Sequence, residues 1–291
     1  MKKTMVWMLT LALVLAYILP ACAASSQKKF VITGPYEIEQ TEVEFPSRDV
    51  TLTGILTVPQ NDQEKYPIAI LTHGFMGDTR DTNHLAEYLG KHGIVALQIN
   101  LMGSGTSGGL YVDSDFTTQP DDILNALAYA KTLDVVDTKN IFLVGKSQGG
   151  FDSGLAALQC EEEINGLCMW FPALCIPDDF RSGKVMTKTF DVNDIPDSVV
   201  MREGYEVSKG MIEQAMAMHI EEIFPNFSKD VLIIHGEKDP IVNISYSLQI
   251  APLYPHATLI IIPKGVHGFS GQNELDALAY TYTFIMNHIA E

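Results

Sequence analysis

Short, continuous apolar segments alternate with amphipathic segments along most of this chain. The first two pairs combine apolar residues 68–72 with amphipathic residues 82–92, and apolar residues 94–100 with amphipathic residues 121–132. Apolar runs of this length are typical of strands buried on both faces, and the amphipathic segments have the periodicity of helices. The alternation therefore predicts an α/β fold, with a mostly parallel central sheet and helices on both faces.

The same pattern continues to the C-terminal end of the chain. It predicts further strands at 141–144, 166–171, 231–235 and 258–262 and helices at 149–158 and 275–289. An antiparallel hairpin is predicted ahead of this array, because alternating segments at 42–45 and 50–58 flank a Pro-Ser-Arg-Asp turn.

One segment, at about 172–228, is too long to be a simple connection between two strands. It is rich in prolines, charges and methionines, and its apolar residues Ile212, Ala215, Met216, Met218 and Ile220 are consistent with an amphipathic helix. We interpret it as an inserted lid beside the active site. The alternative is a helix that packs only on the sheet.

The N-terminal end has the features of a secretory signal peptide at 1–23. Lys2 and Lys3 precede a nearly unbroken apolar run at 5–19, which is shorter than the roughly 18 residues of a membrane-spanning helix. The sequence therefore predicts export, to the cell surface, the periplasm or the medium. Two kinds of processing stay open: a lipid-modified Cys22, as in a lipoprotein, or cleavage by ordinary signal peptidase after Ala23.

The chain is strongly acidic, with a formal net charge of -17, and loss of Lys2 and Lys3 would make it more so. A negative field repels phosphate backbones and anionic membranes, which argues against nucleic acid as a partner and favours a neutral substrate. The cysteines other than Cys22 form no Cys-x-x-Cys pair, and the histidines have no metal-ligand spacing. We therefore expect no metal and no cofactor, and no feature of the sequence indicates an oligomeric state.

The most specific motif follows the predicted strand at 141–144. There, Gly145-Lys146-Ser147-Gln148-Gly149 leads directly into a predicted helix. A Gly-x-Ser-x-Gly segment between a strand and a helix is typical of a nucleophile elbow, in which small neighbours allow a strained turn that exposes the serine hydroxyl. Ser147 is therefore the candidate nucleophile.

A serine hydroxyl needs a base that takes its proton and an acid that orients the base. In elbow-containing folds these follow the serine in the order acid, then histidine. Asp239 and His267 each lie just past a predicted strand, where sites form in open parallel sheets. We interpret Asp239 as the acid and His267 as the base. Glu237 is the nearest rival for the acid, and a purely structural Asp239 that caps a turn is the alternative.

An oxyanion hole also needs two hydrogen-bond donors. The helix that begins at Gln148 supplies one backbone N–H, and the segment after the strand at 68–72 supplies the other, for which we choose Phe75. His73 is expected to shape this loop through hydrogen bonds rather than to take part in catalysis. The glycine-rich residues 103–109 lack the ending of a phosphate-binding P-loop and are interpreted as a flexible loop near the rim of the site.

Several motifs together resemble one group of α/β-hydrolases, the bacterial cinnamoyl or feruloyl esterases. The resemblance spans about 42–288 and rests on these motifs: His73-Gly74-Phe75, Ser147-Gln148-Gly149-Gly150, Pro172-Ala173, Asp178-Asp179, Ile195-Pro196-Asp197, His235-Gly236 with Asp239, and His267-Gly268-Phe269. It implies an α/β-hydrolase catalytic domain at 30–291 that hydrolyses esters of hydroxycinnamic acids with plant cell-wall sugars, through an acyl-enzyme and beneath an inserted lid.

The sequence departs from this group at three positions. Lys146 replaces a histidine that is common before the nucleophile, and it either adds positive potential near the oxyanion or is a tolerated substitution. Among the residues that relatives use against the phenolic hydroxyl, Asp179 is matched, whereas the others correspond to Met186 and Met211. Asp179, Met186 and Met211 are therefore the candidate substrate-binding residues.

An exported peptidase or lipase on the same fold is the main alternative function, since the triad does not select the substrate. A non-catalytic binding protein is the third possible function.

Overall fold

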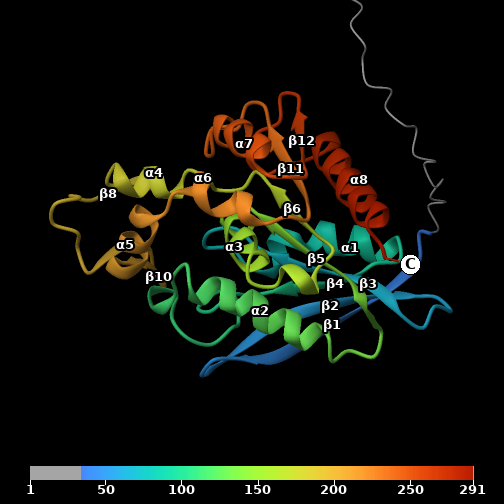
Figure 1. Cartoon of the computed structure of the whole chain (residues 1–291). Coiled ribbons are helices and arrows are strands. Elements are labelled where there is room, and N and C mark those ends of the chain that lie inside the picture. The colour runs from blue at the N-terminus through green and yellow to red at the C-terminus, as the bar shows by residue number, and fades with distance from the viewer. Residues whose placement is uncertain (1–33, 291) are drawn as a thin grey trace, which may run out of the picture. The chain divides into compact units, whose positions relative to one another are not determined.

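A computed structural model describes residues 34–290, so the predicted signal peptide and Cys22 lie outside the described residues. An eight-stranded sheet forms its centre (Figure 1). Its strands are β1 (Glu37–Ser47), β2 (Val50–Gln60), β3 (Tyr66–Thr72), β4 (Val95–Ile99), β5 (Val136–Lys146), β6 (Gly166–Trp170), β11 (Asp230–Gly236) and β12 (Ala257–Ile262). Their order in the sheet is β1-β2-β4-β3-β5-β6-β11-β12. Within residues 34–290, no helix is long and apolar enough to cross a membrane.

The sheet is mostly parallel, as predicted. Strands β1 and β2 form the expected antiparallel hairpin, β2 also runs antiparallel to β4, and every pair from β4 to β12 is parallel. All residues of β3, β4 and β6 are buried. Burial on both faces explains why these segments are continuously apolar rather than alternating.

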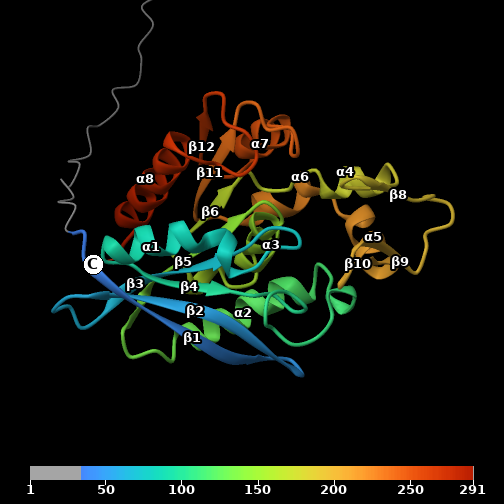
Figure 2. The same cartoon turned by 180° about the vertical axis from the view of Figure 1, so that it is seen from behind.

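Helices cover both faces of the sheet. Helices α1 (Asn83–Lys91) and α8 (Gln272–Asn287) share one apolar cluster and lie side by side in both views (Figures 1 and 2). Helices α2 (Thr118–Ala130), α3 (Gln148–Ala157) and α7 (Ser245–Ile250) contribute to a second cluster on the other face. Side chains of β3 alternate between the two clusters, which is the period of two expected of a strand.

The segment between β6 and β11 is an insertion of small elements. It contains α4 (Ile176–Arg181), two short hairpins made of β7 (Lys184–Val185) with β8 (Lys188–Thr189) and β9 (Ser198–Arg202) with β10 (Tyr205–Ser208), and the helices α5 (Lys209–Ala217) and α6 (Ile220–Ile223). Figure 1 shows these elements gathered at one end of the sheet, apart from α1 and α8.

The helical pattern predicted through Ile220 is interrupted. Helix α5 ends at Ala217, and Met218 is extended, with φ -81° and ψ 139°. The guanidinium of Arg181 donates hydrogen bonds to the carbonyl oxygens of Met216 (2.9 Å) and Met218 (2.8 Å). These tertiary bonds satisfy carbonyl groups at the helix end, which would otherwise lack partners, so the helix stops where apolar spacing alone would continue it.

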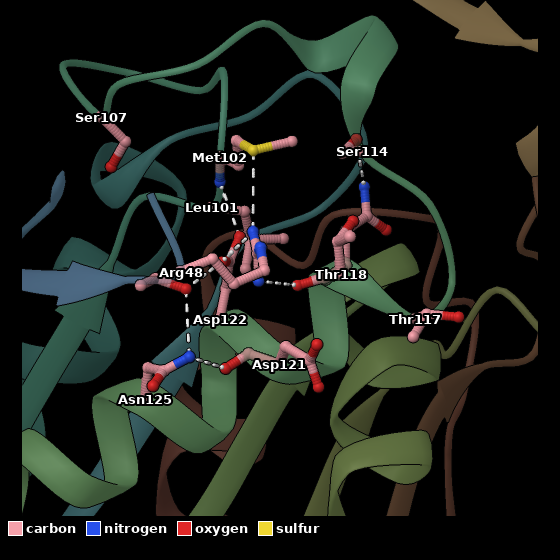
Figure 3. A network of polar contacts seen from close by, with 12 residues as sticks. Arg48, Leu101, Met102, Ser107, Ser114, Thr117, Thr118, Asp121, Asp122 and Asn125 are labelled. Carbon is pink, nitrogen blue, oxygen red and sulfur yellow. Dashed lines mark hydrogen bonds and ion pairs between the residues drawn. The ribbon is translucent and has the colours of Figure 1, made fainter. Parts of the chain in front are cut away.

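A buried carboxylate ties the N-terminal hairpin to the rest of the fold (Figure 3). Asp122 of α2 is fully buried and accepts hydrogen bonds from Ser47 Oγ (2.7 Å) and the backbone N–H of Met102 (2.8 Å). Arg48, in the turn between β1 and β2, lies 2.7 Å from the same carboxylate and donates to the carbonyl of Thr118. Charge-assisted bonds from three segments thus fix the hairpin against α2 and the loop after β4.

Candidate active site

The nucleophile candidate lies in a strained turn between β5 and α3. Ser147 has φ 55° and ψ -120°, a region that side chains rarely occupy. A Cβ on Gly145 would lie 2.1 Å from the carbonyl oxygen of Gly149, and a Cβ on Gly149 would lie 2.2 Å from that of His73. Only glycine fits at both positions. The sequence thereby forces a tight turn that projects the Ser147 side chain from the carboxyl edge of the sheet.

A histidine from a distant loop meets this serine. His267 follows β12, and its Nε2 lies 3.0 Å from Ser147 Oγ, while its Nδ1 lies 2.8 Å from Asp239 Oδ2. A carboxylate only accepts hydrogen bonds, so Nδ1 carries the proton and Nε2 is free to accept from the serine hydroxyl. The His267 ring also packs on Phe171, with 4.5 Å between ring centroids. This arrangement allows Nε2 to act as a general base toward Ser147.

Asp239 is held as a carboxylate. Its side chain is fully buried, and burial alone would raise its pKa. Hydrogen bonds from His235, from His267 and from the backbone N–H groups of Val242 and Ile241 outweigh burial and hold the pKa of Asp239 well below its usual range. The group that faces His267 therefore stays negatively charged, as needed to stabilise an imidazolium.

The rival acid lies elsewhere. Glu237 accepts a hydrogen bond from the backbone N–H of Lys264 (3.0 Å) and pairs with Lys238 (3.2 Å). The Glu237 carboxylate therefore bonds to neighbouring loop residues. Asp239, rather than Glu237, contacts His267.

Sequence reasoning missed a second histidine that supports the acid. His235, at the end of β11, is fully buried, and its Nε2 lies 3.0 Å from the carbonyl of Val242 and 3.3 Å from Asp239 Oδ2. Because both neighbours are acceptors, Nε2 carries the proton, and Nδ1 accepts from the hydroxyl of Ser247 (2.7 Å). Its position four residues before Asp239 was visible in the sequence, but its direction toward the carboxylate was not.

The two proposed oxyanion donors flank the serine. The N–H of Gln148 begins α3, and the N–H of Phe75 lies in a turn closed by a hydrogen bond from Gly77 N–H to the Gly74 carbonyl (3.0 Å). A Cβ on Gly74 would lie 3.2 Å from Ser147 Cβ, so this turn passes directly beside the nucleophile. Within residues 34–290, neither N–H donates a hydrogen bond to another protein group. Both are available to a developing oxyanion.

His73 shapes this turn, as predicted for it. The ring is buried, its Nε2 accepts from the backbone N–H of Leu101 (3.2 Å), and its Nδ1 therefore donates to the carbonyl of Gly74 (2.8 Å). Burial lowers the pKa of His73, which favours this neutral form.

Comparison with known proteins agrees with the fold. The family model described as serine aminopeptidase, S33, matches residues 63–203. The structure of Est1E from Butyrivibrio proteoclasticus with ferulic acid bound superposes with a TM-score of 0.79 at 29% identity, covering 86% of this chain and 100% of that one. The chain is an α/β hydrolase. The α/β hydrolase GrgF from Penicillium sp. sh18 shares the fold at 19% identity, with a TM-score of 0.69 over 87% of this chain and 100% of its own. No curated protein sequence shows significant similarity.

A cavity of about 270 Å³ opens beside Ser147 in this hydrolase. The insertion and the sheet edge both line it, and all three candidate substrate-binding residues, Asp179, Met186 and Met211, belong to its wall. Met211 is fully buried, whereas Met186 is 41% exposed. Phe116, Phe180 and Val207 make most of the remaining wall apolar. The glycine-rich residues 103–109 line none of it, contrary to their expected place at the rim; Ser107 and Gly108 hydrogen-bond instead to β2.

A second cavity, of about 320 Å³, lies on the His267 side of Ser147. Lys146 and Asp81 line it together with His267 and Phe171. The ammonium of Lys146 donates to the backbone carbonyl of Asp81 (2.6 Å) and lies 5.2 Å from the centre of the Trp170 ring. Burial lowers the pKa of Lys146. The ammonium of Lys146, the residue that precedes Ser147 in the sequence, is thus held in the wall of the second cavity.

Cys160 and Cys168 line neither cavity of the site, whereas Cys175 lines the cavity of about 270 Å³ beside Ser147. Cys160, Cys168 and Cys175 are buried free thiols, and burial raises the pKa of each. Within residues 34–290, no group of three or more histidine, cysteine and acidic side chains is arranged to hold a metal ion.

Proposed function

We propose that this hydrolase cleaves carboxylic esters through an acyl-enzyme on Ser147, with hydroxycinnamoyl (feruloyl) or similar small esters as substrates. The observation that carries the proposal is the hydrogen-bonded series Ser147, His267 and Asp239, in which Ser147 lines a mostly apolar cavity. Support for the acyl group comes from Est1E, a 29% identical protein whose structure holds ferulic acid.

The chemistry follows from the positions of the three side chains. Ser147 Oγ attacks the ester carbonyl while His267 Nε2 takes its proton, and the carbonyl oxygen becomes an oxyanion that accepts from Phe75 and Gln148 N–H. The C–O bond to the alcohol then breaks, and the imidazolium gives its proton to the leaving oxygen. Water attacks the acyl-enzyme by the same route, which releases the carboxylic acid and restores the Ser147 hydroxyl.

The two cavities accommodate the two halves of an ester. The leaving oxygen must lie near His267, which protonates it, and His267 lines the second cavity but not the first. The alcohol therefore occupies the second cavity, beside Lys146, and the acyl group occupies the first, mostly apolar cavity that the insertion helps to line. Because the insertion covers the acyl cavity, we propose that it acts as a lid.

Export belongs to the same proposal. A signal peptide at 1–23 would deliver the hydrolase outside the cytoplasm, where esters of plant cell-wall material are found. The mass of the mature N-terminus would distinguish a lipid-modified Cys22 from a freely soluble product.

A panel of substrates tests the function. We expect hydrolysis of methyl ferulate and of short nitrophenyl esters, and much slower or no hydrolysis of triglycerides and aminoacyl amides. The amides are included because the family model that matches residues 63–203 is described as a serine aminopeptidase. Preferred cleavage of the amides would replace the esterase by a peptidase. Cleavage of short aliphatic esters without ferulate would retain the esterase and exclude the hydroxycinnamoyl acyl group.

The role of Asp179 can be measured with two matched esters. Asp179 contributes a carboxylate to a mostly apolar wall, so it can accept a hydrogen bond from a phenolic hydroxyl. We expect Asp179→Asn to lower kcat/KM for methyl ferulate about tenfold, as for loss of a charge-assisted hydrogen bond. Methyl cinnamate, which lacks the hydroxyl, should change little. An equal loss for both esters would assign Asp179 to the shape of the cavity instead.

A further inference from the structure

The turn that contains Phe75 holds one residue in an unfavourable backbone conformation. Met76 has φ +56° in the turn closed by Gly74 and Gly77, a position where glycine is favoured. A non-glycine residue in this region is strained. The N–H of Phe75 acts as an oxyanion donor only while this turn keeps its shape, so something outside the turn must help to hold it.

The β9–β10 hairpin of the insertion reaches this turn. Arg202, at the end of β9, donates from Nη2 to the backbone carbonyl of Met76 (2.7 Å). Its guanidinium lies 4.5 Å from the centre of the Tyr205 ring, and Tyr205 is its direct partner across the hairpin. The ring limits the conformations of the guanidinium, so the hairpin presents a fixed donor to the strained residue.

The same hairpin also reaches the second donor, through Tyr111. Strand β10 lies next to the short helix that contains Tyr111 (Figures 1 and 2), and the Tyr205 and Tyr111 rings are 5.2 Å apart. The buried Tyr111 ring packs edge-on against Phe75, with centroids 5.7 Å apart. Its hydroxyl lies 3.3 Å from Nε2 and 3.4 Å from Oε1 of the Gln148 side chain. One aromatic residue therefore contacts both residues whose N–H groups form the oxyanion hole.

We propose that the β9–β10 hairpin positions the oxyanion hole, with Arg202 and Tyr205 as its positioning residues. Arg202 holds the carbonyl of the strained Met76, and Tyr205 supports the Tyr111 ring that contacts Phe75 and Gln148. Neither residue lines the acyl cavity, so their effect is on the rate of the chemical step rather than on substrate binding. This inference rests on the proposed hydrolase chemistry at Ser147.

Covalent labelling with a fluorophosphonate tests the inference without requiring the natural substrate. In this reaction the Ser147 Oγ–P bond forms, the P–F bond breaks, fluoride leaves, and the serine proton passes to His267. The phosphonyl oxygen occupies the oxyanion hole. We expect Arg202→Met to lower the second-order labelling rate about tenfold, less than the 10²–10³-fold typical of deleting an oxyanion donor. Arg202→Lys, which keeps a charged donor, should recover part of the rate.

Glu203→Gln is the matched control, because Glu203 is exposed in the turn of the same hairpin. It should label like the wild type. With a nitrophenyl ester, Arg202→Met should lower kcat and leave KM within about twofold, the pattern expected of an interaction made in the transition state. Unfolding temperatures should agree among the variants, since Arg202 is a surface residue.

The possible failures are distinct. If the wild-type protein labels and Arg202→Met labels at the same rate, or if only KM rises, the hairpin does not position the oxyanion hole. If the wild-type protein does not label, the proposed hydrolase chemistry is wrong, and the inference that rests on it is wrong too.

Discussion

Ser147→Ala should lower kcat for ester hydrolysis by about 10⁶-fold, the loss typical of removing the nucleophile of a serine triad. Without Oγ, His267 Nε2 has no hydroxyl to deprotonate at 3.0 Å, and no acyl-enzyme can form. A residual rate of about 10³–10⁴ over water should persist, because the oxyanion donors and the cavity remain. Steady-state rates with a nitrophenyl ester, together with loss of fluorophosphonate labelling, measure the effect.

Ser153→Ala is the control for this substitution. Ser153 lies in the same helix, α3, but its hydroxyl contacts Thr72 at 3.4 Å and not His267. It should retain nearly the wild-type kcat. A Ser147→Ala protein that keeps the wild-type rate would refute the catalytic assignment, and intact folding of that variant can be checked by its circular dichroism.

Asp239→Asn should lower kcat by about 10⁴-fold at neutral pH. The amide can present its NH₂ to His267 Nδ1, which then becomes an acceptor and leaves the proton on Nε2. In that tautomer Nε2 cannot take the proton of Ser147. A comparison of kcat between Asp239→Asn and Glu237→Gln tests this reasoning, because Glu237 faces Lys264 and Lys238 instead of His267. Similar losses in the two variants would contradict the choice of Asp239 as the acid.

The same substitution has a consequence for acid stability. The folded-state pKa of Asp239 lies below its unfolded value, so the ionised carboxylate stabilises the fold above the unfolded pKa of about 4. This contribution is lost as the pH falls through the folded-state pKa. Urea unfolding should therefore show the wild-type free energy of unfolding declining more steeply than that of Asp239→Asn below about pH 4. Parallel declines would show that the folded-state pKa is not lowered.

The strands and the elbow were predictable because each depends on nearby residues. Burial on two faces imposes apolar runs such as β3 and β6. The turn at Ser147 is recognisable from five consecutive residues, since a Cβ on Gly145 would clash with the carbonyl of Gly149, but glycine is required at Gly149 by the distant carbonyl of His73. The sequence also placed Asp239 and His267 past strand ends, and carboxyl ends of parallel strands share one edge of a sheet. That topology places both at the sheet edge that carries Ser147, whereas their catalytic roles stay proposals.

Other features depend on residues that are far apart in the chain. Helix α5 ends at Ala217 because Arg181, more than thirty residues earlier, bonds to carbonyl groups at its end. The contact of His235 with Asp239 arises because the fold of the loop after β11 turns the Asp239 carboxylate back toward the His235 ring. Apolar spacing carries no information on such polar contacts.

The sequence by itself thus determined the strand-helix array and the position of the serine turn, because burial periodicity acts over a few residues and the Gly-x-Ser-x-Gly motif is contiguous. Only the tertiary structure decided which polar groups meet. It selected Asp239 over Glu237 beside His267 and placed Arg202 against Met76, because hydrogen bonds require distances near 3 Å that sheet order and loop packing set. It also divided the site into an apolar cavity under the insertion and a second cavity beside Lys146, since both are bounded by side chains from segments remote in sequence.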